Sequence, residues 1–362
     1  MEAPETAVMP GGQLLGFQPG KRPSFSPDGL AWRLKSGSDL VLQVHMNRSG
    51  KAETVQPSVA FFFTDQPPTN RCFRLKLTAF NLDIPAGESR YKIRQTYALP
   101  VNVHALRISA HAHYLGKDLK GYAVLPSGER RELIWIRNWD FKWQGDYAYA
   151  NPVRLPKGSI LTLDYTYDNS TNNVRNPHNP PQPIHWGLQS SDEMGELTLQ
   201  LLPDNARDWD TLAQDFARYF VGVSSDFYRF RLEKNPQDTE AQRRLGRILA
   251  SQGRLAEAIG HLTEAIRLDP KADEPHFDLG SIYLRNNRLT DAYEEFRTVV
   301  KLNPGDSDAF GSLGLIAFRS GNNGHRKGIF RTSTHAESPG QPRARDISAN
   351  CATPRLERGA WG

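Results

Sequence analysis

The chain has 362 residues, of which 38% are hydrophobic, 10% aromatic and 23% charged, which favours two or three folded domains and excludes a disordered chain. Two cysteines exclude a disulfide-dense scaffold and a cysteine-rich zinc cluster, and no apolar run approaches the roughly 18 residues that a membrane span needs. The net charge is +5, and residues 326–362 contribute most of it, with seven Lys or Arg against three Asp or Glu. The rest of the chain has 38 basic and 37 acidic residues, so it lacks the excess of positive charge that a nucleic-acid-binding surface requires.

Residues 1 to about 204 are predicted to form strands. Short β-branched and aromatic runs alternate there with clusters of Pro, Gly, Asn and Asp, for example at residues 65–70 and 173–183. This pattern is typical of an antiparallel β-sandwich. Residues 1–13 have neither a basic start nor an apolar core, so we expect no signal peptide in this chain.

The segment Leu106–His113 (LRISAHAH) holds the first candidate site. Side chains alternate along a strand, so Leu106, Ile108, Ala110 and Ala112 are expected on one face and both histidines on the other. Two imidazoles at i and i+2 can bind one metal ion, and imidazole suits zinc, copper, iron or nickel. The alternative is that His111 and His113 are ordinary solvent-facing residues.

A second candidate lies at residues 192–202 (DEMGELTLQLL). Leu197, Leu199 and Leu201 mark an apolar face, and alternation places Met194 on the opposite, polar face. A thioether is a soft ligand that favours copper(I), although methionine more often fills gaps in a core. The two histidines with Met194 therefore predict an open copper site.

From residue 205 onward the periodicity is helical, with residues 205–236 predicted as a helical linker or cap. Residues 237–324 then repeat with a period of 34, which is shown by Pro236, Pro270 and Pro304 and by Gly246, Gly280 and Gly314. This period resembles the tetratricopeptide repeat, a helix-turn-helix unit that forms a solenoid and binds partner peptides. We expect two complete units and a broken third.

The last segment, residues 325–362, lacks the second helix that the third repeat needs. It is rich in Pro, Ser and Arg, and we expect either a disordered tail or a frame-shifted end.

Four segments in order resemble the copper type II, ascorbate-dependent monooxygenases, in particular bacterial relatives of the peptidylglycine α-hydroxylating enzymes. They are residues 40–46 (LVLQVHM), 111–128 (HAHYLGKDLKGYAVLPSG), 167–170 (YDNS) and 190–199 (SSDEMGELTL). The resemblance covers about residues 12–203. It implies two jelly-roll domains, here the C-terminal part of a first domain at residues 1–64 and a complete second domain at residues 65–204.

The resemblance also implies a metal site in each domain. The catalytic copper would be bound by His111, His113 and Met194, and His45 matches one histidine of the electron-transfer copper. His185 would lie near the catalytic metal without binding it. Ascorbate or another one-electron donor would be the reductant, an organic molecule the substrate, and the periplasm or the cell exterior the location.

Two departures from the family bear on function. No histidine precedes His45, so the electron-transfer site lacks its histidine pair, and the chain resembles a fragment. The positions that hold a substrate carboxylate in peptide-amidating members are Ser109, Glu196 and Thr198 here, which disfavours anionic peptide ends. Two functions remain open: a copper-dependent monooxygenase that hydroxylates C–H bonds, and a non-catalytic interaction protein that binds partners through its repeats.

Overall fold

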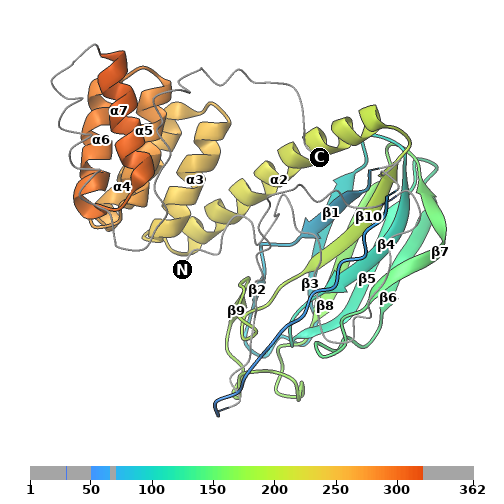
Figure 1. Cartoon of the computed structure of the whole chain (residues 1–362). Coiled ribbons are helices and arrows are strands. Elements are labelled where there is room, and N and C mark those ends of the chain that lie inside the picture. Colours follow the sequence, from blue (N-terminus) through green and yellow to red (C-terminus); the bar gives the residue numbers. More distant parts are fainter. Residues whose placement is uncertain (1–29, 31–49, 66–70, 321–362) are drawn as a thin grey trace. The chain divides into compact units, whose positions relative to one another are not determined.

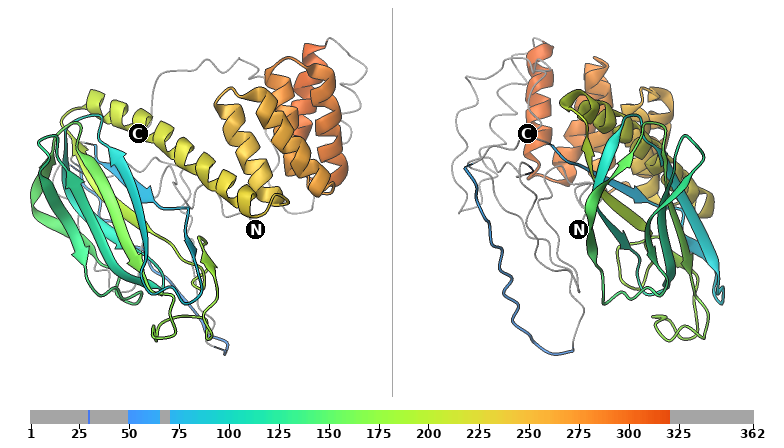
Figure 2. Two further views of the ribbon diagram at one scale, coloured as in Figure 1. Left: turned by 180° about the vertical axis from the view of Figure 1, so that it is seen from behind. Right: turned by 90° about the vertical axis from the view of Figure 1, so that its right-hand side faces the viewer.

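The structure is a computed structural model that describes Leu30, residues 50–65 and residues 71–320. The chain divides into two compact units, with the division between Ala217 and Arg218. One unit is built on β-strands and the other on helices, and each is described by itself below (Figures 1 and 2).

Among its described residues, the β-unit contains two four-stranded antiparallel sheets and a two-stranded sheet. The first four-stranded sheet has the order β1-β10-β4-β7, the second β3-β8-β5-β6, and β2 pairs with β9 (Figure 1). The strands are β1 Phe73–Thr78, β2 Asp83–Ile84, β3 Tyr91–Ala98, β4 Val103–His111, β5 Gly116–Val124, β6 Arg130–Ile136, β7 Asp146–Leu155, β8 Ile160–Tyr167, β9 Ile184–His185 and β10 Glu196–Pro203.

The two larger sheets pack face to face. Leu197 and Leu199 of β10 are fully buried, and so are Leu163 and Tyr165 of β8. Gly121 of β5 allows close approach, because a Cβ atom there would lie only 2.8 Å from the Leu197 side chain. The predicted antiparallel β-sandwich is therefore present, whereas the finer expectation of a jelly-roll stays a prediction.

Strand β4 departs from simple alternation. The register of its pairing with β7 shifts between Ala105 and Arg107, which is the mark of a β-bulge. Ala105 and Ile108 are buried as a result, while Leu106 is only partly buried. The prediction that Leu106 shares the core face with Ile108 was therefore wrong, although Ile108, Ala110 and Ala112 are all buried.

The first part of helix α2 (Ala206–Lys234) closes one edge of the β-unit. Phe216 packs edge-to-face against Phe73 and Tyr97, with ring centroids 5.8 and 5.2 Å apart. The Tyr97 hydroxyl donates to Asp215 at 2.9 Å, and the Trp209 indole donates to the carbonyl of Cys72 at 3.2 Å. The β-unit thus extends beyond the predicted boundary at residue 204.

As far as residue 320, the helical unit holds the second part of α2, two helix pairs and one further helix. The pairs are α3 Thr239–Ser251 with α4 Leu255–Leu268, and α5 Glu274–Arg285 with α6 Leu289–Leu302, followed by α7 Ser307–Arg319. Pro270 and Pro304 follow the ends of α4 and α6, where the 34-residue period predicted the second helix of each repeat to end. At Gly246 the paired helices come close, because an added Cβ would lie 2.8 Å from Leu262.

The second part of α2 contributes to the core of the first helix pair. Tyr228 and Leu232 pack against a buried cluster that includes Leu245, Leu249 and Leu262. This is where the sequence predicted a cap. An isolated helix pair cannot bury its own apolar face. The contact with Tyr228 and Leu232 therefore covers part of the apolar face of the α3–α4 pair.

Several predicted features lie outside the described residues. They are His45, most of the partial first domain at residues 1–64, the end of the third repeat and the whole tail at residues 325–362. Residues 50–65, which are described, contain no strand. Within the described ranges, no helix combines the length and the apolar character that crossing a membrane demands.

Candidate metal site

His111 is the last residue of β4, where this strand pairs with β10, and His113 follows two residues later. The register places Glu196 opposite His111, and Met194 lies two residues before Glu196, in the segment that precedes β10. The imidazole rings of the two histidines are 5.2 Å apart between centroids and are inclined at 82°. The predicted proximity of the two rings is thus observed.

A hydrogen bond fixes the proton of His111. Its Nδ1 lies 2.7 Å from Oε1 of Gln144, and the Gln144 amide nitrogen donates to the carbonyl of Phe141 at 2.8 Å. That carbonyl can only accept, so the amide nitrogen must face it and the amide oxygen must face His111. His111 therefore donates from Nδ1, and its Nε2 lone pair is left for a metal.

His113 is oriented in the same way by a different element. Its Nδ1 lies 3.1 Å from the backbone carbonyl of Asp192, which again can only accept. Burial, followed by repulsion from His111, lowers the pKa of His113 to about 4. The ring is therefore neutral near pH 7, and neutral imidazole is the form that binds metals.

Glu193 joins the segment before β10, which carries Met194, to the segment that carries the histidines. Its buried carboxyl group accepts the backbone N–H groups of His113, of Leu115 at 2.8 Å and of Met194 at 2.8 Å. The Tyr167 hydroxyl adds a bond of 2.8 Å to the carbonyl of Met194. These contacts fix the backbone on both sides of the candidate site.

Met194 is less open than alternation predicted. Its exposed fraction is only 9%, so it is not on a solvated polar face. The segment just before β10 is held to the rest of the β-unit by the bond from the Tyr167 hydroxyl to the Met194 carbonyl and by the bond from the Leu115 backbone N–H to Glu193. At Gly195, which follows, an added Cβ would lie 2.7 Å from the Tyr167 hydroxyl and 2.6 Å from Ile93.

Aromatic side chains form one wall beside the histidines. The ring of Phe141 lies 5.5 Å from His113 and 6.4 Å from His111, and that of Tyr114 lies 4.6 Å from Phe141. Trp139 supports this loop: its buried indole donates to the carbonyl of His113 at 2.9 Å. The wall gives the site a partly apolar surrounding.

The neighbouring strand positions carry paired charges. Glu196 forms an ion pair of 2.9 Å with Lys76, and their side chains are only 12% and 15% exposed. Ser109 lies opposite Thr198 on the paired strands. A carboxylate already paired with its own lysine gives no attraction to an anionic substrate, which agrees with the disfavoured anionic peptide ends.

His185 lies on β9 and its imidazole is engaged elsewhere. Its Nδ1 is 3.1 Å from Asp83 on the partner strand β2, and the side chain is 62% exposed. The backbone carbonyl of His185 accepts the N–H of Glu193 at 3.1 Å. The role of His185 near the metal stays a prediction. Its backbone contacts the candidate site through Glu193, whereas its side chain is paired with Asp83.

Sequence reasoning missed Gln144 and Glu193. Gln144 follows the candidate histidines by more than 30 residues and is only 4% exposed, and a single glutamine among aromatic residues gives no recognisable signal. The sequence did offer a signal for Glu193, because this residue is adjacent to the candidate ligand Met194. Over the described ranges, no group of three or more His, Cys, Asp or Glu side chains could hold a metal, so this candidate depends on Met194 as its third ligand.

The comparisons with known proteins concern the helical unit. The tetratricopeptide repeat family model matches residues 249–316. This part of the chain is a tetratricopeptide repeat region. No curated protein matches the chain.

Two solved structures of MamA resemble the chain at 20% identity and a TM-score of 0.31. The first covers 37% of this chain and 75% of that chain, and the second covers 34% and 68%. None of these matches points to a copper monooxygenase. The repeat match favours the interaction function over the enzyme.

Proposed function

We propose that the protein binds a protein or peptide partner through its repeats and one copper ion through its β-unit. The observation that carries the first part is the repeat match over residues 249–316. Successive repeats align their first helices, and the surface that these helices share is where such solenoids bind extended peptides.

Charged side chains link the first helices of the two complete repeats. Arg243 of α3 lies 3.3 Å from Asp278 of α5, and Arg247 lies 3.5 Å from the same carboxylate. Arg243 is nearly buried, whereas the Arg247 side chain is 39% exposed. Arg247 is therefore the member of this group that a bound peptide can reach.

Panning a random-peptide display library against the full chain tests this function, with affinities of the selected peptides measured by calorimetry. We expect the selected peptides to lose about tenfold or more in affinity for Arg247→Glu. The matched control is Arg267→Glu on α4, whose partner Glu264 lies in the same helix. Equal losses in both variants, or no enriched peptide, would contradict peptide binding on this surface.

The second part of the proposal rests on the two imidazoles, whose Nδ1 atoms each face a fixed acceptor. His111 and His113 would each bind through Nε2, and Met194 would supply a thioether. Because that set joins two borderline ligands to one soft ligand, it suits copper in both oxidation states better than it suits zinc. Copper at such a site supplies one-electron redox chemistry and dioxygen activation, which a monooxygenase uses to hydroxylate C–H bonds.

The residues around the proposed copper site each have a specific structural role. Gln144 and the Asp192 carbonyl keep the two imidazole protons on Nδ1, and Glu193 holds the histidine and methionine segments together. Phe141 and Tyr114 shield one side from water. With His45 as the single candidate ligand for a second copper, we expect one copper per chain and little or no coupled turnover.

Copper loading followed by substitution tests this second part. We expect His111→Ala to abolish stoichiometric binding. Met194→Ala should keep most of the copper(II) affinity and weaken copper(I), because the thioether is the softer ligand. The matched control is His178→Ala, in the loop after β8. One copper per chain in the His111 variant would overturn the site.

A further inference from the structure

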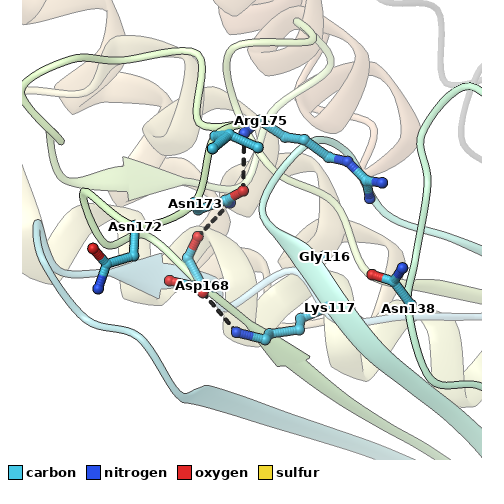
Figure 3. A pocket seen from close by; sticks show the side chains of 8 residues that line it. Gly116, Lys117, Asn138, Asp168, Asn172, Asn173 and Arg175 are labelled. Atoms are coloured by element: carbon cyan, nitrogen blue, oxygen red, sulfur yellow. Dashed lines mark hydrogen bonds and ion pairs between the residues drawn. The ribbon is translucent and has the colours of Figure 1, made fainter.

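A polar pocket lies beside the histidine segment, lined by side chains that the proposed functions do not use. Its volume is about 250 Å³, and three separate parts of the chain line it (Figure 3). They are the start of β5 (Gly116 and Lys117), the loop after β6 (Asn138) and the loop after β8 (Asp168 and residues 172–175). Amide and cationic groups dominate this lining.

Hydrogen bonds hold the walls of the pocket in place. The buried Asp168 carboxylate accepts from Lys117 at 2.7 Å and from the Ser170 hydroxyl at 2.6 Å. The Asn173 side chain donates to the carbonyl of Asp168 at 2.7 Å and accepts from the backbone of Arg175 at 3.0 Å. The Arg175 guanidinium donates to the carbonyl of Trp139. A ligand would therefore meet groups that are already positioned.

Several hydrogen-bonding groups at the pocket remain unused. The Lys117 ammonium has three N–H donors, and one of them bonds to Asp168. The side-chain amides of Asn138 and Asn172 make no hydrogen bond to the part of the chain that the structure describes. The Asp168 carboxylate, in contrast, already has partners at both oxygens. The unused groups are mostly donors.

The charged groups and the volume of the pocket limit the class of ligand that it can bind. Two cations, Lys117 and Arg175, line the pocket; Lys117 is paired with Asp168, and Arg175 lies 3.7 Å from Asp140, which is outside the lining, so the pocket offers charged donors without a large net charge. Charged donors bind carboxylates strongly, and the amides of Asn138 and Asn172 can donate to and accept from hydroxyl groups. The volume is below the range of about 300–1,000 Å³ that is typical for drug-sized ligands. We propose that this pocket binds a small hydroxylated carboxylate, of the kind of a sugar acid.

This inference is independent of copper. The histidines and the pocket lie on different parts of the segment 111–117, and Trp139 contacts both: its indole donates to the carbonyl of His113, and its own carbonyl accepts from Arg175. The side chains of the two sites are different. A variant of one site therefore leaves the other testable.

Calorimetric titration of the full chain with D-gluconate tests the pocket. Acetate and D-glucose serve as comparison ligands, because the first lacks the hydroxyl groups and the second lacks the charge. We expect gluconate to bind more tightly than acetate and glucose to give no binding. Arg175→Gln should weaken gluconate binding about tenfold or more, through loss of a charge-assisted contact.

Two further variants make the result decisive. Asn138→Ala removes an exposed amide, so the fold is preserved, and we expect gluconate affinity to fall several-fold. Lys142→Gln, in the same loop as Asn138 but outside the pocket lining, is the matched charge control and should bind gluconate as the parent does. His111→Ala should lose copper and keep gluconate. Absent gluconate binding, equal binding of glucose, or full affinity in both pocket variants would overturn the proposal.

Discussion

Gln144 Oε1 lies 2.7 Å from Nδ1 of His111, and this bond joins the loop after β6 to the end of β4. Polar partners of metal-binding histidines typically contribute a factor of 10 to 100 in metal affinity. We therefore expect Gln144→Ala to lower copper affinity by about that factor, measured by competition with a chelator of known affinity. Gln252→Ala, in the exposed turn after α3, should leave copper binding unchanged. Unaltered affinity in the Gln144 variant would show that His111 does not depend on this bond.

Glu193 should be required for the stability of the segment around the histidines. Glu193→Ala leaves three buried backbone N–H groups without an acceptor, at roughly 1–3 kcal/mol for each. We expect a loss of about 3 kcal/mol or more, read as faster hydrogen exchange of residues 113–116, and a smaller loss for Glu193→Gln, which keeps one acceptor oxygen. Glu132→Ala, on an exposed strand position, is the control. Equal exchange in the alanine variant and the parent would contradict this role.

Asp168 should contribute to acid sensitivity. Burial alone would raise the pKa of this carboxyl, but hydrogen bonds from Lys117 and Ser170 outweigh burial and hold it below its ordinary value. A lowered carboxyl pKa adds stability above the unfolded pKa near 3.8, and this contribution disappears as the pH falls through the folded pKa. Asp168→Asn should therefore flatten the decline in stability below about pH 4, measured by thermal unfolding. Glu129→Gln, on an exposed side chain, should retain the parent's decline.

The repeat region offers a matched pair of glycines. At Gly246 an added Cβ would lie 3.1 Å from the carbonyl of Ala258 and 2.8 Å from Leu262, whereas at Gly260 nothing lies within 4 Å. Gly246→Ala should destabilise the first helix pair by about 1–3 kcal/mol through overpacking. Gly260→Ala should stabilise it by up to about 1 kcal/mol, since alanine favours helix. Hydrogen exchange of α3 and α4 measures both, and the same sign in both variants would contradict the close approach.

The repeats could be predicted in detail because their period is a property of the sequence itself. Pro270, Pro304 and Gly246 each mark a contact or an end that recurs every 34 residues. The proximity of His111 and His113 could likewise be predicted, since the two residues are only two positions apart in an extended segment at the end of β4. The bulge beside Leu106 was not, because it arises from pairing with β7 and not from local sequence.

The partners of the histidines could not be predicted for a related reason. Gln144 reaches His111 only because the loop after β6 is folded back, with Trp139 packed against Gly116, where an added Cβ would lie 2.7 Å from the indole. Such a fit depends on residues far apart in the chain. Met194 shows the same limit: alternation predicted a solvated face, whereas the residue is buried and its carbonyl accepts the hydroxyl of Tyr167 from a distant strand.

The hydrogen bond from the Gln144 amide to the carbonyl of Phe141 has a consequence for protein engineering. Transplanting the His-x-His strand alone into another β-sandwich would leave both rings free to choose either tautomer, and their metal affinity would fall. A transferable binding module must therefore include the whole aromatic loop from Trp139 to Gln144 and the turn that holds Glu193.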